Sequence, residues 1–121
     1  MNTMKKGRFG ERAAAKYLAE HGYYVRQRNF KTKYGEIDII VDDGETLVFV
    51  EVKARAGSRP ASAVTYTKQQ KIVLTARHYL AKTPTALKTR LDIIEVFMTT
   101  IDSEFRVLKI NHIENAFGAR G

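Results

Sequence analysis

Residues 35–53 read GEIDIIVDDGETLVFVEVK and contain two strand-like runs separated by a turn. The runs cover residues 36–41 and 46–53 and are rich in Ile and Val, which favour β-strands. The Asp43-Gly44 pair between them is typical of a tight hairpin turn. Both runs are apolar on both faces, so we expect the hairpin to lie near the middle of a sheet that is covered on both sides.

An amphipathic helix is predicted on each side of this hairpin in the sequence. The first covers roughly residues 8–21 and ends at Gly22, and the second covers roughly residues 68–82 and ends before Pro84. Apolar side chains that recur every three or four positions give each helix one buried face, and Glu11 lies at the margin of the first. The two faces consist of Ala13, Ala14, Tyr17 and Leu18, and of Ile72, Val73, Ala76, Tyr79 and Leu80.

Three further strands and a loop complete the predicted architecture. The strands cover residues 23–27, 90–98 and 105–110, and residues 54–67 read as an irregular loop that contains Gly and Pro. The resulting order, α-β-β-β-α-β-β, predicts an α/β fold with a central mixed sheet flanked by helices. The chain has 121 residues, of which 44% are hydrophobic, and this is enough for one core. We therefore expect residues 1–121 to form a single domain.

Composition narrows the classes of function. The chain contains no cysteine, which excludes disulfides, thiol nucleophiles and cysteine-based zinc sites. A short polar N-terminus and the lack of a long apolar stretch favour a cytoplasmic protein without a membrane span. The 21 Lys and Arg residues against 13 Asp and Glu residues give a net charge of +8. A small domain with this charge often binds nucleic acid, although a merely solvated basic surface is the alternative.

Three charged residues of the two central runs are expected to converge. Side chains alternate along a strand, so Glu51 and Lys53 share one face. A hairpin loop centred on the Asp-Gly pair would place Asp38 opposite Phe49, with Glu51 on the diagonal, whereas a register shifted by two would pair Asp38 with Glu51 directly. In either register the two carboxylates share a face and come within roughly 5–8 Å. On the first run, alternation places Glu36, Asp38 and Ile40 on one face and Ile37, Ile39 and Val41 on the other.

Two explanations account for two carboxylates and a lysine on an apolar sheet face, where bare charges would be costly. In the structural explanation, Lys53 forms ion pairs with Glu51 or Asp38 near the end of the sheet. In the functional explanation, Asp38 and Glu51 are oxygen ligands for Mg²⁺ or Mn²⁺, and a backbone carbonyl and water complete the coordination. Lys53 would then orient the nucleophile or neutralise charge that develops on a phosphodiester. The positive net charge of the chain favours the functional explanation.

The same residues resemble a known nuclease signature. Residues 35–40 and 47–53 look like the P-D…(D/E)-x-K pattern of the restriction-endonuclease-like superfamily, with Ile37 in place of the proline. More closely, the chain resembles the YraN-type uncharacterised bacterial family, which is considered distantly similar to archaeal Holliday-junction resolvases. The likeness spans nearly the whole chain, and it includes Gly10-Glu11, Tyr17-Leu18, Gly22-Tyr23, Asn29, Lys68-Gln69, Ala76, Arg90-Leu91-Asp92 and His112-Ile113-Glu114-Asn115-Ala116-Phe117.

The resemblance implies a restriction-endonuclease-like αβββαβ core and a metal-dependent endonuclease that hydrolyses phosphodiesters in DNA, including branched or structured DNA. It implies that Asp38 and Glu51 bind Mg²⁺ or Mn²⁺ and that Lys53 is the catalytic amine. Glu11 matches a helix acid of the resolvase-like branch and is expected to join the site as a further ligand or through water. Many junction-cleaving relatives work as dimers, so a homodimer is among the expected assemblies. The alternative is a non-catalytic nucleic-acid-binding module that keeps the fold.

Several polar residues around these runs are candidates for contacts with nucleic acid, although each also fits a solvated face. The candidates are Arg8, Arg12, Arg55, Lys68, Gln69 and Lys71. Gln69 falls on the inward face of its helix, where its amide either caps backbone groups or holds a water or phosphate. Glu36 fits a solvated strand end better than an extra ligand. We interpret Asp92 as a structural hydrogen-bonding residue and His112 as a residue for packing or for the start of a helix.

Overall fold

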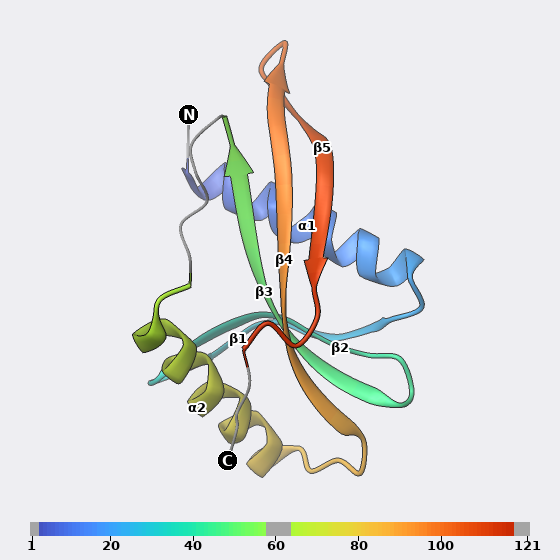
Figure 1. Cartoon of the computed structure of the whole chain (residues 1–121), viewed down its shortest axis with the longest axis vertical. Helices are drawn as coiled ribbons and strands as arrows, with labels where there is room; N and C mark the ends of the chain where they lie inside the picture. The colour runs from blue at the N-terminus through green and yellow to red at the C-terminus, as the bar shows by residue number, and fades with distance from the viewer. Residues whose placement is uncertain (1–2, 58–63, 118–121) are drawn as a thin grey trace.

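A computed structural model describes residues 3–57 and 64–117 of the chain. In this part of the chain two helices and five strands follow one another in the predicted order (Figure 1). They are α1 (Thr3–Glu20), β1 (Tyr24–Thr32), β2 (Gly35–Asp42), β3 (Thr46–Ala56), α2 (Tyr66–Lys82), β4 (Lys88–Ile101) and β5 (Glu104–Ile113). The α/β architecture with its αβββαβ core is therefore confirmed. Residues 58–63 of the predicted loop lie outside the described residues.

The five strands form one mixed sheet in the order β1-β2-β3-β4-β5, so the predicted central hairpin does lie in its middle. Strands β1 to β3 are antiparallel neighbours, as are β4 and β5, whereas β3 and β4 are parallel. The parallel pair requires a crossover, which α2 provides. Figure 1 shows α1 and α2 on opposite sides of the twisted sheet, and the β4–β5 hairpin projects beyond the other strands.

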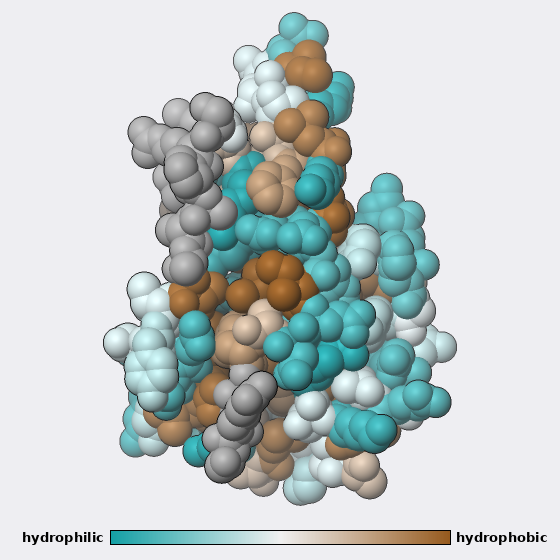
Figure 2. Space-filling view, viewed as in Figure 1, coloured by the Kyte–Doolittle hydropathy of each residue, from teal (hydrophilic) through white to brown (hydrophobic). Residues whose placement is uncertain are grey.

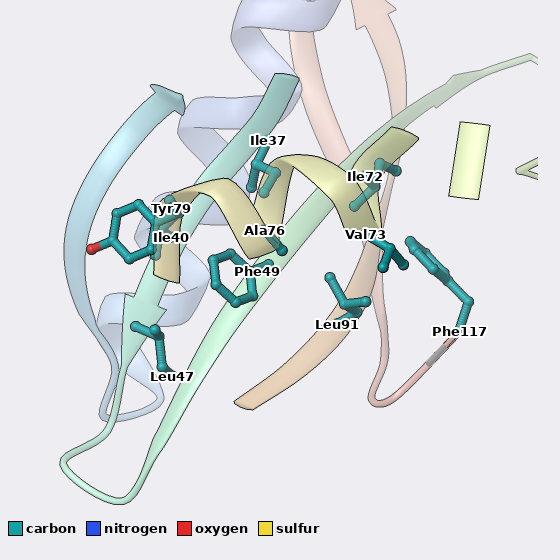
Figure 3. Packing of buried hydrophobic residues seen from close by; sticks show 10 residues of the cluster. All are labelled: Ile37, Ile40, Leu47, Phe49, Ile72, Val73, Ala76, Tyr79, Leu91 and Phe117. Atoms are coloured by element: carbon teal, nitrogen blue, oxygen red, sulfur yellow. The ribbon is translucent and has the colours of Figure 1, made fainter. Parts of the chain in front are cut away.

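Two apolar clusters hold the helices against the sheet, and strand alternation separates them. Leu47 and Phe49 of β3 face α2, where they pack with Ile72 and Tyr79 (Figure 3). The alternate residue Val48 faces α1. The remaining α1-side core consists of Ala14, Leu18, Ile39, Val41, Val50, Ile94, Val96 and Met98. The helix faces predicted from periodicity are thus the faces that pack on the sheet, with Leu80 partly buried at the margin.

Several details differ from the sequence-based expectation. Helix α1 begins at Thr3 and not near residue 8, and β3 continues to Ala56, into the expected loop. Strand β1 extends to Thr32 instead of ending near Gln27, because it continues to pair with β2 as far as Gly35. It is an edge strand with mostly exposed side chains, so hydrophobic periodicity gives no signal there. The expected alternation in β2 also fails at one point, since Ile37 packs in the α2-side cluster and not with Ile39.

Asp92 joins several elements through a buried network and is the structural residue that the sequence predicts. Its side chain is fully buried and accepts hydrogen bonds from Arg90 at 2.8 and 2.9 Å and from the backbone N–H of Asn115 at 2.9 Å. His112 Nε2 lies 2.7 Å from Asp92 Oδ2, and His112 Nδ1 lies 3.2 Å from the hydroxyl of Tyr17 in α1. Burial opposes ionisation of Asp92, but these hydrogen bonds outweigh it and lower its pKa. The network therefore ties α1 to β4 and β5.

The surface is mixed in character. On the face seen in Figure 2, hydrophobic residues lie in the hollow beside α2, and others are exposed on the projecting β4–β5 hairpin. The exposed apolar side chains of that hairpin are Ile101, Val107, Leu108 and Ile113. None of the helices in the described part of the chain is both long enough and apolar enough to span a membrane.

Gly10 lets α1 approach β3 closely, and this contact can be tested. A Cβ atom at Gly10 would lie 3.1 Å from the Cβ of Ala54, whereas a Cβ atom at Gly7 of the same helix would meet nothing within 4 Å. The variants Gly10→Val and Gly7→Val share the same change in helix propensity. We expect Gly10→Val to lower the free energy of unfolding by about 1–3 kcal/mol more than Gly7→Val in urea titrations. Equal effects of the two variants would contradict the close contact.

Candidate active site

The register of the central hairpin brings the two predicted acids face to face. Strands β2 and β3 pair Ile39 with Val50, so the next position along this register places Asp38 opposite Glu51. This is the shifted register, the second of the two that the sequence leaves open. The strand pairing ends there, and Asp38 Oδ2 accepts a hydrogen bond of 2.8 Å from the backbone N–H of Val52. The side chain of Asp38 thus takes the place of the next strand–strand hydrogen bond.

A cleft of about 320 Å³ opens where β2 and β3 separate. It lies between the N-terminal halves of α1 and α2, both of which contribute to its wall. The lining residues are Gly7, Glu11, Glu36, Asp38, Glu51, Val52, Ala54 and Lys68. The structure therefore brings together Asp38, Glu51, Glu11 and Lys68 from the predicted site. Lys53 stands beside the cleft through its contact with Glu51.

The two facing carboxylates repel each other in a poorly solvated position. Glu51 is only 5% exposed, and Asp38 is half-buried. Burial, the charge of Glu51 and a hydrogen bond with Glu51 raise the pKa of Asp38 to about 8, although the Val52 N–H acts in the opposite direction. The charge of Glu11 adds a smaller increase. Without a bound cation, the Asp38–Glu51 pair therefore keeps a proton at neutral pH.

Two lysines meet at Glu51. Lys68 Nζ lies 2.8 Å from Glu51 Oε2, and Lys53 Nζ lies 3.7 Å from the same oxygen. Burial and a hydrogen bond with Lys68 lower the pKa of Lys53. Burial would also lower the pKa of Lys68, but its hydrogen bond to Glu51 prevails and raises it. Among the described residues, both lysines form their ion pairs with Glu51 and neither forms one with Asp38, although the charge of Asp38 also acts on Lys68.

The position of Lys68 follows from the start of α2. Thr65 is the N-cap of the helix, and its hydroxyl accepts a hydrogen bond of 3.2 Å from the backbone N–H of Lys68. This cap places Lys68 in the first turn, where its side chain reaches across the cleft to β3. The sequence predicts Lys68 as a phosphate contact but gives no sign of its ion pair with Glu51.

Asn29 organises the outer rim of the cleft, a role that the sequence analysis missed. Its side-chain amide donates hydrogen bonds of 3.0 Å to both Glu11 and Glu36. Its backbone has a φ of 52°, in the left-handed region that Asn tolerates better than most residues. Arg28 Nη2 also lies 4.0 Å from Glu11 Oε1. Glu11 and Glu36 are thus held from β1, whereas Asp38 and Glu51 face each other deeper in the cleft.

The donor set fits a divalent cation held mainly by two acids. Across residues 3–57 and 64–117, no three His, Cys, Asp or Glu side chains are already arranged to hold a metal ion. Asp38 and Glu51, however, supply the hard carboxylate oxygens that Mg²⁺ and Mn²⁺ prefer, and such ions usually keep several water ligands. A cation between them would also relieve the repulsion that raises the pKa of Asp38. Glu11 lines the same cleft but is engaged by Asn29.

The other predicted nucleic-acid contacts lie outside the cleft. Arg55 forms an ion pair of 3.3 Å with Glu95 of β4. The amide of Gln69 donates a hydrogen bond of 2.9 Å to the carbonyl of Val64, which is the backbone-capping role that the sequence allows. Lys71 is exposed on α2. Arg8 and Arg12 line a separate groove on the other flank of α1.

The strained acid pair predicts an unusual dependence of stability on pH. Because Asp38 has a pKa of about 8 in the folded protein against 3.8 as a free group, the folded state binds more protons between these values. The free energy of unfolding therefore falls as the pH rises from about 4 to about 8. Asn at position 38 keeps the acceptor for the Val52 N–H and cannot ionise. In EDTA at pH 8 we expect Asp38→Asn to stabilise the protein by about 1–2 kcal/mol in urea titrations.

The control for this measurement is Asp102→Asn, which changes an exposed carboxyl in the β4–β5 turn. We expect it to leave the pH profile unchanged, whereas Asp38→Asn should flatten it between pH 5 and 8, a range taken from the pKa of about 8. A wild-type stability that rises over this range would contradict the repulsion between Asp38 and Glu51, as would a destabilised Asp38→Asn variant.

Comparison with known proteins identifies the family. The model of the uncharacterised protein family UPF0102 matches residues 10–96. A UPF0102 protein of Clostridium botulinum (strain Loch Maree / Type A3) is 44% identical over 116 residues, which cover 92% of each chain. UPF0102 proteins of Caldanaerobacter subterraneus subsp. tengcongensis and Caldicellulosiruptor bescii are 42% and 40% identical, and each alignment covers 97% of this chain and at least 98% of the relative. These matches confirm the resemblance to an uncharacterised bacterial family, and the chain belongs to the family UPF0102.

Proposed function

We propose that this protein is a cytoplasmic, metal-dependent endonuclease that hydrolyses phosphodiester bonds of DNA at the Asp38–Glu51 cleft. The observation that carries the proposal is the facing pair of carboxylates, whose mutual repulsion raises the pKa of Asp38 to about 8, with the lysines at one side only. An amide at position 38 would accept the Val52 N–H without this repulsion, so the second, poorly solvated acid favours a task beyond a structural hydrogen bond. The positive net charge of +8 supports a polyanionic substrate.

Asp38 and Glu51 would hold Mg²⁺ or Mn²⁺ in this proposal, with Glu11 as a further contact through water. When bound, such a cation would polarise the phosphodiester and favour ionisation of the attacking water. In the hydrolysis, the water oxygen forms a new bond to phosphorus, and the ester bond between phosphorus and one sugar oxygen breaks. The attacking water gives up one proton to solvent, and the leaving oxygen takes up one proton from solvent and becomes a hydroxyl group, so the protons balance.

The lysines of the cleft have distinct parts in this chemistry. Lys53 is largely shielded, with 21% of its side chain exposed, and its pKa is lowered, so its ammonium group is a suitable donor to the attacking water or the developing charge. Lys68 is more exposed, at 48%, and can turn from Glu51 toward a phosphate of the DNA. Branched or structured DNA and a homodimeric assembly are part of the proposal on the strength of the resemblance to junction resolvases.

A second candidate is a nucleic-acid-binding module without catalysis. It is favoured by the absence of a preformed group of three metal-binding side chains within residues 3–57 and 64–117. In this case Lys53 and Lys68 would serve only to neutralise Glu51. Binding without any metal-dependent cleavage distinguishes this candidate from the endonuclease.

The test is a cleavage screen of the purified chain on duplex, single-stranded, flap and four-way-junction DNA with Mg²⁺ or Mn²⁺. We expect metal-dependent nicking of at least one substrate, and a loss of roughly 100-fold or more for Asp38→Asn, Glu51→Gln and Lys53→Met. The matched control is Glu45→Gln, an exposed turn residue outside the cleft, which should cut like the wild type.

The outcomes separate the two candidates. Cleavage that survives all three cleft substitutions would reject the proposed site. Binding to DNA without cleavage of any substrate would favour the binding module. The absence of both binding and cleavage at low salt would contradict both candidates.

A further inference from the structure

A second hollow lies along α1, on a different flank from the active-site cleft. It has a volume of about 480 Å³ and lies between the N-terminal half of α1 and the turn of the β4–β5 hairpin. Its main lining residues are Lys5, Arg8, Phe9 and Arg12 from α1 and Phe105 and Arg106 from β5. The hollow therefore joins residues from opposite ends of the chain. Neither the sequence pattern nor the resemblance assigns a role to it as a whole.

The charge of this groove is strongly positive. Four cationic side chains line it, and Glu104 is the one acid among its lining residues. Arg106 forms an ion pair of 3.3 Å with Glu104, and the two side chains are 56% and 68% exposed. Water therefore screens this ion pair, and Arg106 remains available to another anion. The first turn of α1 contains no acidic residue, and the helix dipole adds partial positive charge there. An anionic ligand with several charges suits this groove.

Two aromatic rings form part of the wall. The rings of Phe9 and Phe105 lie 5.2 Å apart between centroids, tilted by 37°, and both side chains are half-buried. Grooves that follow only the backbone of a duplex need cations but no aromatic rings. Proteins that bind single strands combine a basic groove with aromatic side chains on which unpaired bases stack.

We propose that this groove, hereafter the α1–hairpin groove, binds a single-stranded segment of nucleic acid, with its phosphates on Arg8, Arg12 and Arg106 and a base against Phe9 and Phe105. That this strand belongs to the DNA that is cut rests on the proposed endonuclease function. The recognised class is then DNA with an unpaired strand beside the scissile bond.

The position of the groove relative to the cleft supports this connection. Gly7 and Glu11 line the active-site cleft, and Arg8 and Arg12, the residues that follow them in α1, line the groove. The two hollows thus lie at the same level of one helix, on faces roughly 100° apart around its axis. A strand seated in the groove can reach the carboxylates within a few nucleotides by crossing the N-terminal half of α1.

The binding test uses fluorescence anisotropy in EDTA, so that cleavage does not interfere. The probes are a labelled mixed-sequence single strand and the duplex of the same sequence. Phe105→Leu keeps an apolar side chain against the core but removes the ring. We expect it to weaken single-strand binding by roughly fivefold or more and to leave duplex binding within about twofold. Leu108→Ala, an exposed apolar residue of the same strand outside the groove, is the control and should bind like the wild type.

A second pair of variants tests the charges, and it does not depend on a ring that also packs against the core. Arg12→Ala should weaken binding and lower the salt slope of the affinity by about one. Lys16→Ala removes the same charge from the next turn of α1, outside the groove. It should change the affinity and its salt slope less than Arg12→Ala does. Thermal melts of all four variants serve as the control for folding.

Several results would overturn the proposal. The first is that Phe105→Leu binds the single strand as tightly as the wild type. The second is that Lys16→Ala and Arg12→Ala lose the same amount of affinity. The third is that poly-glutamate competes for the protein as well as single-stranded DNA does. This binding test is independent of catalysis. If the groove variants bind the single strand normally and the protein shows metal-dependent cleavage, only the groove proposal is rejected. If these variants bind the single strand more weakly and the protein cuts no substrate, only the proposed function is rejected.

Discussion

The separation of β2 from β3 is the constraint on which the candidate site depends. Pairing between the two strands ends at Ile39 and Val50, and the side chain of Asp38 then replaces the next backbone hydrogen bond. At this point a cleft opens between two strands whose central residues are buried. The register also places Asp38 opposite Glu51, where both carboxylates have lost most of their water.

The charges around the cleft are arranged in two layers that have different partners. The inner acids are Asp38 and Glu51. Among the described residues, Lys53 and Lys68 form ion pairs with Glu51 only, and the Asp38–Glu51 pair keeps a proton at neutral pH. The outer acids, Glu11 and Glu36, are bridged by the amide of Asn29. Like charges in a poorly solvated position cost stability, and such perturbed pairs are candidates for functional sites. In the proposed function a divalent cation would neutralise the inner pair, and the net charge of +8 would attract a polyanionic substrate to it.

The sequence predicts much of this fold, because β2 and β3 are buried on both faces and the helices carry clear apolar faces. It could not decide the hairpin register, since the Asp-Gly turn fits two loop geometries that differ by two positions. The end of β1 was missed because an exposed edge strand shows no hydrophobic alternation. The contact of Asn29 with Glu11 and Glu36, and the groove that joins Phe9 to Phe105, depend on tertiary packing of distant segments. No local spacing signals them.

The central claim is that Asp38 and Glu51 form a divalent-cation site, and calorimetric titration with Mn²⁺ tests it most directly. At pH 7, in two buffers of different ionisation enthalpy, the wild type should bind one Mn²⁺ per chain and release about one proton, because the pair holds a proton before binding. Asp38→Asn should bind far more weakly, without this proton release, and Glu45→Gln should match the wild type. No binding by the wild type, or equal binding by Asp38→Asn, would contradict the claim.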